Sequence, residues 1–100
     1  MRLSKHEKEI IVSCTKDKLG KNSRIILFGS RTDDNRKGGD IDLLIQPGIQ
    51  ASQEEMLKKK IFLLLEIERK LGEQNIDIII QQSNDQRKIV NTALITGIVI

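Results

Sequence analysis

Aromatic side chains are nearly absent from this 100-residue sequence, which contains two phenylalanines, Phe28 and Phe62, and no tryptophan or tyrosine. Proteins that bind single strands of nucleic acid stack the bases on aromatic side chains, and this chain has no such platform. Its formal net charge is only +3, from 17 basic and 14 acidic side chains. We therefore expect no direct binding of nucleic acid and a core built from isoleucine and leucine.

Cysteine is equally scarce. The single cysteine, Cys14, excludes both an intramolecular disulfide and a cysteine-based metal site. Because it follows the apolar residues Ile10, Ile11 and Val12, we expect it to be a small residue of the core. The only histidine, His6, is expected on the surface of a helix.

The sequence also lacks a long apolar run. No segment approaches the roughly 20 apolar residues that span a bilayer, and residues 1–9 are mostly charged, unlike a secretory signal peptide. A chain of 100 residues with 38% apolar side chains fits one globular domain, residues 1–100. We therefore expect a cytoplasmic, single-domain protein that does not contact a membrane.

Three segments begin with Ser-x-x-Glu/Gln, the capping-box pattern, in which the serine oxygen accepts a backbone N–H of the first helical turn. Each segment also ends at a glycine, which is typical of a helix C-terminus. The predicted helices run from Ser4 to Gly20, from Ser52 to Gly72 and from Ser83 to Gly97.

The middle helix has the strongest periodicity. Its predicted apolar face consists of Leu57, Ile61, Leu64 and Leu71, widened by Leu63, Leu65 and Ile67. The run of lysines at 58–60 is interpreted as a solvated helical turn, with a phosphate or partner contact as the alternative. Glu54 and Glu66 stand four residues before Lys58 and Lys70, the favourable order for ion pairs.

Short runs typical of strands lie between the helices, at residues 24–28, 41–45 and 76–80, with a fourth candidate at 98–100. Helices that alternate with strands in this way pack on a small sheet. We therefore predict an α+β fold in which helices cover a mixed sheet of three to four strands.

Two aspartates interrupt the second predicted strand, "DIDLLI". Side chains alternate between the faces of a strand, so Asp40 and Asp42 share one face while Ile41 and its apolar partners take the other. Asp77 occupies the same kind of position in the third strand, "NIDIII". If the two strands are neighbours, three carboxylates gather on one sheet face, and oxygen ligands of this kind suit Mg²⁺ together with substrate phosphates.

The turn after the first strand carries Gly29, Ser30 and Arg31. Glycine lets a backbone approach a ligand closely, serine begins a turn whose N–H groups can hold a phosphate, and arginine can neutralise phosphate charge. Each piece alone has a plainer explanation: Gly-Ser as an ordinary turn, Asp-x-Asp as a loop or edge feature, and Asp77 as a charge that protects an edge strand. Their combination favours a phosphate and metal site.

The combined motif resembles a known family. Gly29-Ser30, nine intervening residues, Asp40-Ile41-Asp42 and a later Asp77 in an apolar strand are similar to the minimal nucleotidyltransferases. These are the smallest members of the DNA polymerase beta-like nucleotidyltransferase superfamily, and the resemblance covers residues 24–81. Many members have ten residues between the serine and the first aspartate, and many carry serine where this chain has Gly39.

The resemblance implies a nucleotidyltransferase fold and a role for each motif residue. Gly29 and Ser30 would hold the triphosphate of a nucleotide, with Arg31 as a further phosphate contact by its position. The aspartates Asp40, Asp42 and Asp77 would bind two Mg²⁺ ions, and Asp77 would help to deprotonate the attacking hydroxyl. The implied reaction transfers a nucleoside monophosphate from a nucleoside triphosphate to a hydroxyl and releases pyrophosphate.

The family also suggests a biological role. Minimal nucleotidyltransferases are often paired with a small helical HEPN protein, and the pair resembles a toxin–antitoxin system in which the nucleotidyltransferase transfers AMP from ATP to the toxin. We expect this role here, with the acceptor supplied by another molecule or by a second copy in a homo-oligomer. Two alternatives stay open: a non-catalytic antitoxin that acts by contact through its first and last helices, and a nucleotide-binding sensor without turnover.

Overall fold

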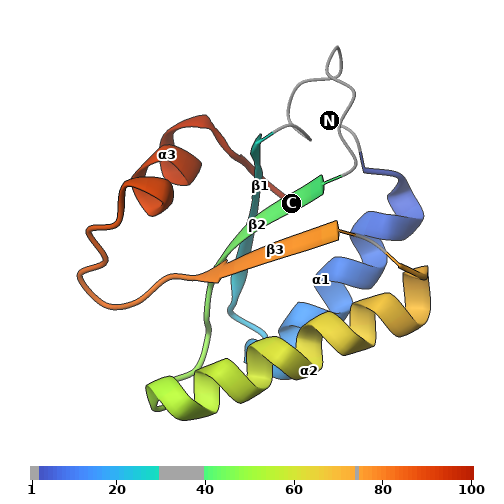
Figure 1. Cartoon of the computed structure of the whole chain (residues 1–100), viewed down its shortest axis with the longest axis horizontal. Coiled ribbons are helices and arrows are strands. Elements are labelled where there is room, and N and C mark those ends of the chain that lie inside the picture. The colour runs from blue at the N-terminus through green and yellow to red at the C-terminus, as the bar shows by residue number, and fades with distance from the viewer. Residues whose placement is uncertain (1–2, 30–39, 74) are drawn as a thin grey trace.

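Helices and strands alternate along the chain in the predicted order. The computed structural model describes residues 3–29, 40–73 and 75–100. The helices are α1 (Lys5–Leu19), α2 (Gln53–Leu71) and α3 (Lys88–Thr96). The strands are β1 (Arg24–Phe28), β2 (Asp40–Gln46), β3 (Asn75–Ile80) and β4 (Ile98–Val99) (Figure 1).

The four strands form one mixed sheet in the order β3-β2-β1-β4. Strand β1 is antiparallel to both β2 and β4, whereas β2 and β3 are parallel. A parallel pair needs a crossover connection, which is usually a helix, and α2 provides it here. The predicted α+β class and mixed sheet are therefore confirmed.

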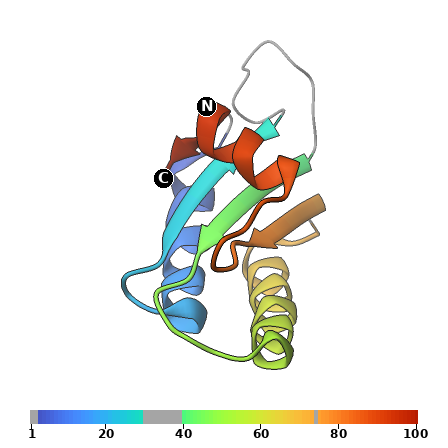
Figure 2. The same cartoon turned by 90° about the vertical axis from the view of Figure 1, so that its left-hand side faces the viewer.

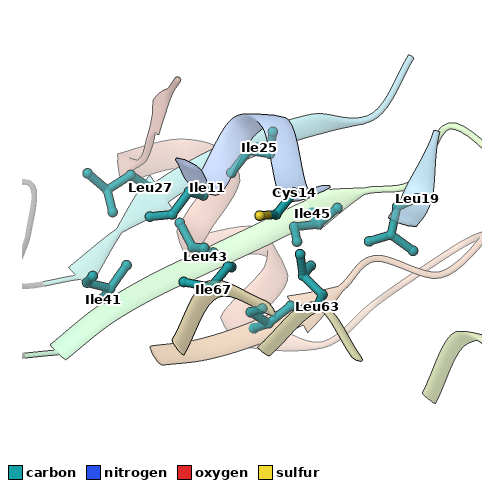
Figure 3. Packing of buried hydrophobic residues seen from close by; sticks show 11 residues of the cluster. Ile11, Cys14, Leu19, Ile25, Leu27, Ile41, Leu43, Ile45, Leu63 and Ile67 are labelled. Carbon is teal, nitrogen blue, oxygen red and sulfur yellow. The ribbon is translucent and has the colours of Figure 1, made fainter. Parts of the chain in front are cut away.

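Helices cover both faces of the sheet. Figure 2 shows α3 on one side, while α1 and α2 lie on the other. The larger hydrophobic cluster lies between the sheet and the pair α1 and α2, and it contains Leu27 of β1 and Leu43 of β2 (Figure 3). Ile78 of β3 belongs to it as well. Cys14 of α1 and Ile67 of α2 belong to the same cluster, so the prediction that Cys14 is a core residue is confirmed.

A second, smaller cluster lies on the other face of the sheet. Val90 and Ala93 of α3 pack there against Ile26, Phe28 and Leu44. Successive residues of β2 therefore enter different clusters, as the period of two requires.

The predicted N-terminal caps of the first two helices are confirmed. Ser4 and Glu7 form a full capping box: the Ser4 hydroxyl accepts the N–H of Glu7, and the Glu7 carboxylate accepts the N–H of Ser4. The Ser52 hydroxyl accepts the N–H of Glu55 at the start of α2. The helices end at Gly20, Gly72 and Gly97, as predicted.

The predicted cap at Ser83 is wrong. Helix α3 begins only at Lys88, without a side-chain cap. Asn84 has a left-handed backbone with φ of 55°, which a continuing helix cannot contain. Asp85 instead organises this loop, because its carboxylate accepts the N–H groups of Gln82 and Arg87.

The predicted apolar face of α2 is only partly correct. Leu63 and Ile67 are buried in the core, but Leu57, Ile61 and Leu65 are exposed. The helix carries two apolar stripes, and the core uses the one that contains Leu63 and Ile67. Helical periodicity detects an apolar stripe without showing which stripe the sheet will cover.

The two stripes predict different costs of truncation. Leu63→Ala should lower the free energy of unfolding by about 2–5 kcal/mol, because it leaves a cavity in the core. Leu65→Ala, the matched control two residues away, should change it by no more than about 0.5 kcal/mol. Urea unfolding at low protein concentration measures both, and equal costs would contradict the assignment of the core stripe.

The loop before α3 predicts a pH-dependent contribution to stability. The Asp85 side chain is only 3% exposed and accepts hydrogen bonds from Arg87 Nη2 at 2.6 Å and from the Gln82 N–H at 3.0 Å. The Arg87 guanidinium, helped by the Gln82 N–H, holds the pKa of Asp85 well below its usual range. A depressed folded-state pKa stabilises the protein above the unfolded pKa of about 3.9, and this contribution is lost as the pH falls through the folded value.

Asp85→Asn should therefore lower the urea midpoint at pH near 7, and its difference from the wild type should shrink as the pH falls below about 4. Asp17→Asn, at an exposed position of α1, is the control and should follow the wild type at every pH. A difference for Asp85→Asn that is independent of pH would contradict the assigned role of this carboxylate.

Candidate active site at one end of the sheet

Three strands meet at the end of the sheet that carries the predicted site. Strand β1 finishes there, and β2 and β3 begin there (Figure 1). The register sets Phe28 opposite Asp42 and Asp42 opposite Asp77. Residues far apart in the sequence are thereby placed in one row across the sheet.

Asp42 and Asp77 are direct neighbours on one face of the sheet. Adjacent strands lie about 4.8 Å apart, and the two residues occupy paired positions of the parallel strands β2 and β3. The following residues, Leu43 and Ile78, point into the core beneath α1 and α2, so the two carboxylates lie on the opposite face. Asp42 is half-buried and Asp77 is exposed. The pair is therefore accessible from solvent at the outer strand.

Gly29 lies against the Asp42 carboxylate. Its φ of +75° is in the left-handed region that favours glycine. A Cβ atom built at Gly29 would lie 3.1 Å from Asp42 Cγ and would collide with Oδ2. Glycine is favoured here both by the positive φ and by the space available, and the close approach brings the Gly29 backbone to the Asp42 carboxylate.

Three of the predicted site residues lie wholly or partly outside the described part of the chain. The backbone of Asp40 is the first residue of β2 and pairs with Asn75, but its side chain lies outside the description, as do Ser30 and Arg31. Among the described residues, no group of three or more histidine, cysteine, aspartate or glutamate side chains gathers to hold a metal. Asp42 and Asp77 form a pair in the register of β2 and β3, and the role of every predicted site residue stays a prediction.

The chemistry of the pair suits a hard divalent cation. Both donors are carboxylates, and Mg²⁺ is usually bound by one or two carboxylates together with substrate phosphates. Carboxylates held side by side repel each other unless a cation lies between them. The residues present therefore fit a Mg²⁺ ion held by Asp42 and Asp77.

One polar residue at this end was not predicted. Asn75 is exposed and stands two residues before Asp77, in register with Asp40. The alternation in "NID" places it on the same face of β3 as Asp77. The alternation of side chains along β3, which identified Asp77 from the sequence, could also have identified Asn75.

A groove of about 700 Å³ lies elsewhere, between α2 and the carboxyl end of β3. Its lining includes Met56, Lys60, Ile80 and Arg87 and contains no acidic side chain. It therefore lacks the paired carboxylates that distinguish the opposite end of the strand.

A comparison with protein families agrees with this geometry. The model of the family described as "nucleotidyltransferase domain" matches residues 8–100, nearly the whole chain. The chain belongs to this family. The match supports nucleotidyl transfer as the general activity of this chain. Members of the family generally use a nucleoside triphosphate and a divalent metal. The search of curated proteins finds no match. No helix in the described ranges is long and apolar enough to cross a membrane.

The contact between Gly29 and Asp42 can be tested by comparing two glycines. Gly29→Ala should destabilise the protein more than Gly72→Ala, although both positions have positive φ, +75° and +81°. A non-glycine residue at such a φ costs about 1 kcal/mol or more, but only the alanine at position 29 would also meet a side chain, because nothing lies within 4 Å of the site for a Cβ at Gly72.

Urea unfolding of the single variants measures the excess cost at position 29. A second pair of variants, with and without Gly29→Ala in an Asp42→Ala background, should show that this excess disappears when the carboxylate is removed. An excess that persists would mean that Asp42 is not the obstacle.

Proposed function

We propose that this nucleotidyltransferase transfers AMP from ATP to a hydroxyl group of a partner protein, with Mg²⁺ as the metal. The observation that carries the proposal is the register of Asp42 with Asp77 beside the close approach of Gly29. Phosphoryl transfer depends on positioning and on neutralisation of charge more than on covalent help from the protein. Paired carboxylates next to a glycine turn are suited to that task.

Each carboxylate of the site has a proposed role in the reaction. Asp40 and Asp42 would hold two metal ions, and Asp77, the third carboxylate expected from the family, would bind one of them. Mg²⁺ bound there would neutralise phosphate charge at the attacking and leaving oxygens. The acceptor hydroxyl oxygen forms a bond to the α-phosphorus, the bond from that phosphorus to its bridging oxygen breaks, and pyrophosphate leaves. The exposed Asp77 carboxylate accepts the proton of the hydroxyl.

The position of Asp77 supports a protein acceptor. Asp77 is exposed on β3, which is the outermost strand of the sheet on that side. A hydroxyl on the surface of another folded protein can reach such a position without entering a deep pocket. The specific partner that we propose, a HEPN-type helical protein in a toxin–antitoxin pair, rests on the resemblance to the minimal nucleotidyltransferases.

A contact-only antitoxin is the second candidate, and one observation favours it. In the described part of the chain, exposed large hydrophobic residues occur on α2, α3 and β4, and none on α1. On α3 and β4 they are Ile89, Leu94, Ile95, Ile98 and Val99. The last helix therefore offers a binding surface of the expected kind, whereas the first helix does not. A sensor that binds ATP and Mg²⁺ without turnover is the third candidate.

Labelled ATP separates these candidates. The purified protein is incubated with Mg²⁺, ATP labelled in its adenine and a lysate of its source cells, and the products are separated by size. We expect a labelled protein band of another size, whose mass identifies the acceptor, together with release of pyrophosphate. Asp42→Asn should reduce both by at least about 100-fold, because it removes a carboxylate that stabilises the transition state.

Asp17→Asn is the matched control, since it makes the same chemical change at an exposed position of α1. It should label the acceptor like the wild type. No label with either protein, while a partner is still captured, would support the contact-only antitoxin. ATP binding without pyrophosphate release or capture would support the sensor.

A further inference from the structure

The outer face of α2 carries a second apolar stripe that the described chain leaves uncovered. It consists of Leu57, Ile61, Phe62 and Leu65, which are 57%, 48%, 59% and 56% exposed. Isolated exposed apolar residues are normal, but a contiguous group marks an interaction site. We call these four residues the α2 stripe.

The α2 stripe is remote from the carboxylates. Helix α2 packs its other side, through Leu63 and Ile67, against the sheet face opposite Asp42 and Asp77. Ile61, Phe62 and Leu65 therefore lie away from that buried side of α2. Leu57, at the edge of the stripe, also lines the groove between α2 and β3. A partner bound there would leave the candidate active site open.

Charged residues bracket the stripe in a self-complementary order. Lys58, Ile61, Leu65 and Glu68 follow one another at spacings of three, four and three residues, the spacing of a helix–helix contact line. The spacing is the same in both directions along the helix. In an antiparallel pair of α2 helices, the register that sets Ile61 opposite Leu65 of the second copy also sets Lys58 opposite Glu68 of the second copy.

The existing ion pairs leave these charges available. Lys58 Nζ lies 3.9 Å from Glu54 Oε1, and both side chains are mostly exposed, so the pair is weak. The exposed Glu68 side chain forms no ion pair with any described residue. A two-fold symmetric dimer would contain two Lys58–Glu68 contacts, one from each copy to the other.

We propose that the protein forms a two-fold symmetric homodimer through the outer face of α2, with the two helices antiparallel. The α2 stripes pack against each other, and Lys58 of each copy pairs with Glu68 of the other. The charge pattern favours a second copy over a different protein, because one sequence supplies both members of each pair in one register. The dimer holds two candidate active sites that face away from the interface.

Charge reversal with mixing tests this arrangement. Sedimentation velocity of the purified chain, from low micromolar to several hundred micromolar, should show a monomer–dimer equilibrium. Lys58→Glu and Glu68→Lys should each weaken self-association by about tenfold or more, because like charges then face each other twice. An equimolar mixture of the two variants should restore association as a heterodimer, since opposite charges again face each other at both contacts.

Lys16→Glu on the exposed side of α1 is the control for the charge change, and Ile95→Gln on α3 is the control for loss of an exposed apolar residue. Both should associate like the wild type. All variants lie at exposed positions, and circular dichroism checks that each remains folded. Three outcomes would overturn the proposal: a wild-type monomer throughout the range, a dimer insensitive to both reversals, or a mixture that associates no better than either variant alone.

Discussion

The alternation of side chains along β2 is the constraint on which the remainder of the structure depends. Strand β2 lies inside the sheet, with β1 on one side and β3 on the other. Leu43 faces the large core beneath α1 and α2, and Leu44 faces the small core beneath α3. Asp42 shares its face with Leu44 and is half-buried. A shift of one residue in register would turn Asp42 into the large core beneath α1 and α2, so the packing of that core fixes which face carries the carboxylate.

The glycine turn depends on the same strand. Gly29 follows the last residue of β1, and its backbone passes so close to Asp42 that a single methyl group would not fit. Gly29 directly follows Phe28, which pairs with Asp42 in the register, and its φ is positive. The pairing of β1 with β2 therefore places the Gly29 backbone beside the Asp42 carboxylate.

Local patterns predicted the parts of this architecture that local physics decides. The Ser4 capping box and the alternation in "DIDLLI" each involve residues a few positions apart. The capping box is confirmed, and the alternation is confirmed from Ile41 to Ile45. The sequence could not reveal that α2 would pack on Leu63 and Ile67 and not on Leu57 and Ile61, because both stripes have helical spacing. It also could not reveal that Asp85 would replace Ser83 as the organiser of its loop, since both residue types accept backbone N–H groups.

The pairing of Asp42 with Asp77 was expected only on condition that β2 and β3 are neighbours, which is a tertiary outcome. Only part of the candidate site follows from such patterns, because the contact of Gly29 with Asp42 depends on how β1 pairs with β2.

The outermost position of β3 links the completeness of the candidate site to the local stability of one strand. In the described sheet, β3 is joined to a neighbour on one side only, whereas β2 is held on both. Proteins open locally as well as globally, and β3 is held by its hydrogen bonds to β2 and by the packing of Ile78 in the large core. A detachment of β3 alone would carry Asp77 away while Gly29 and Asp42 stayed in place. The lifetime of the pairing between β2 and β3 would then set how long both carboxylates stand together, so amide exchange along β3 would report on the site as directly as on the fold.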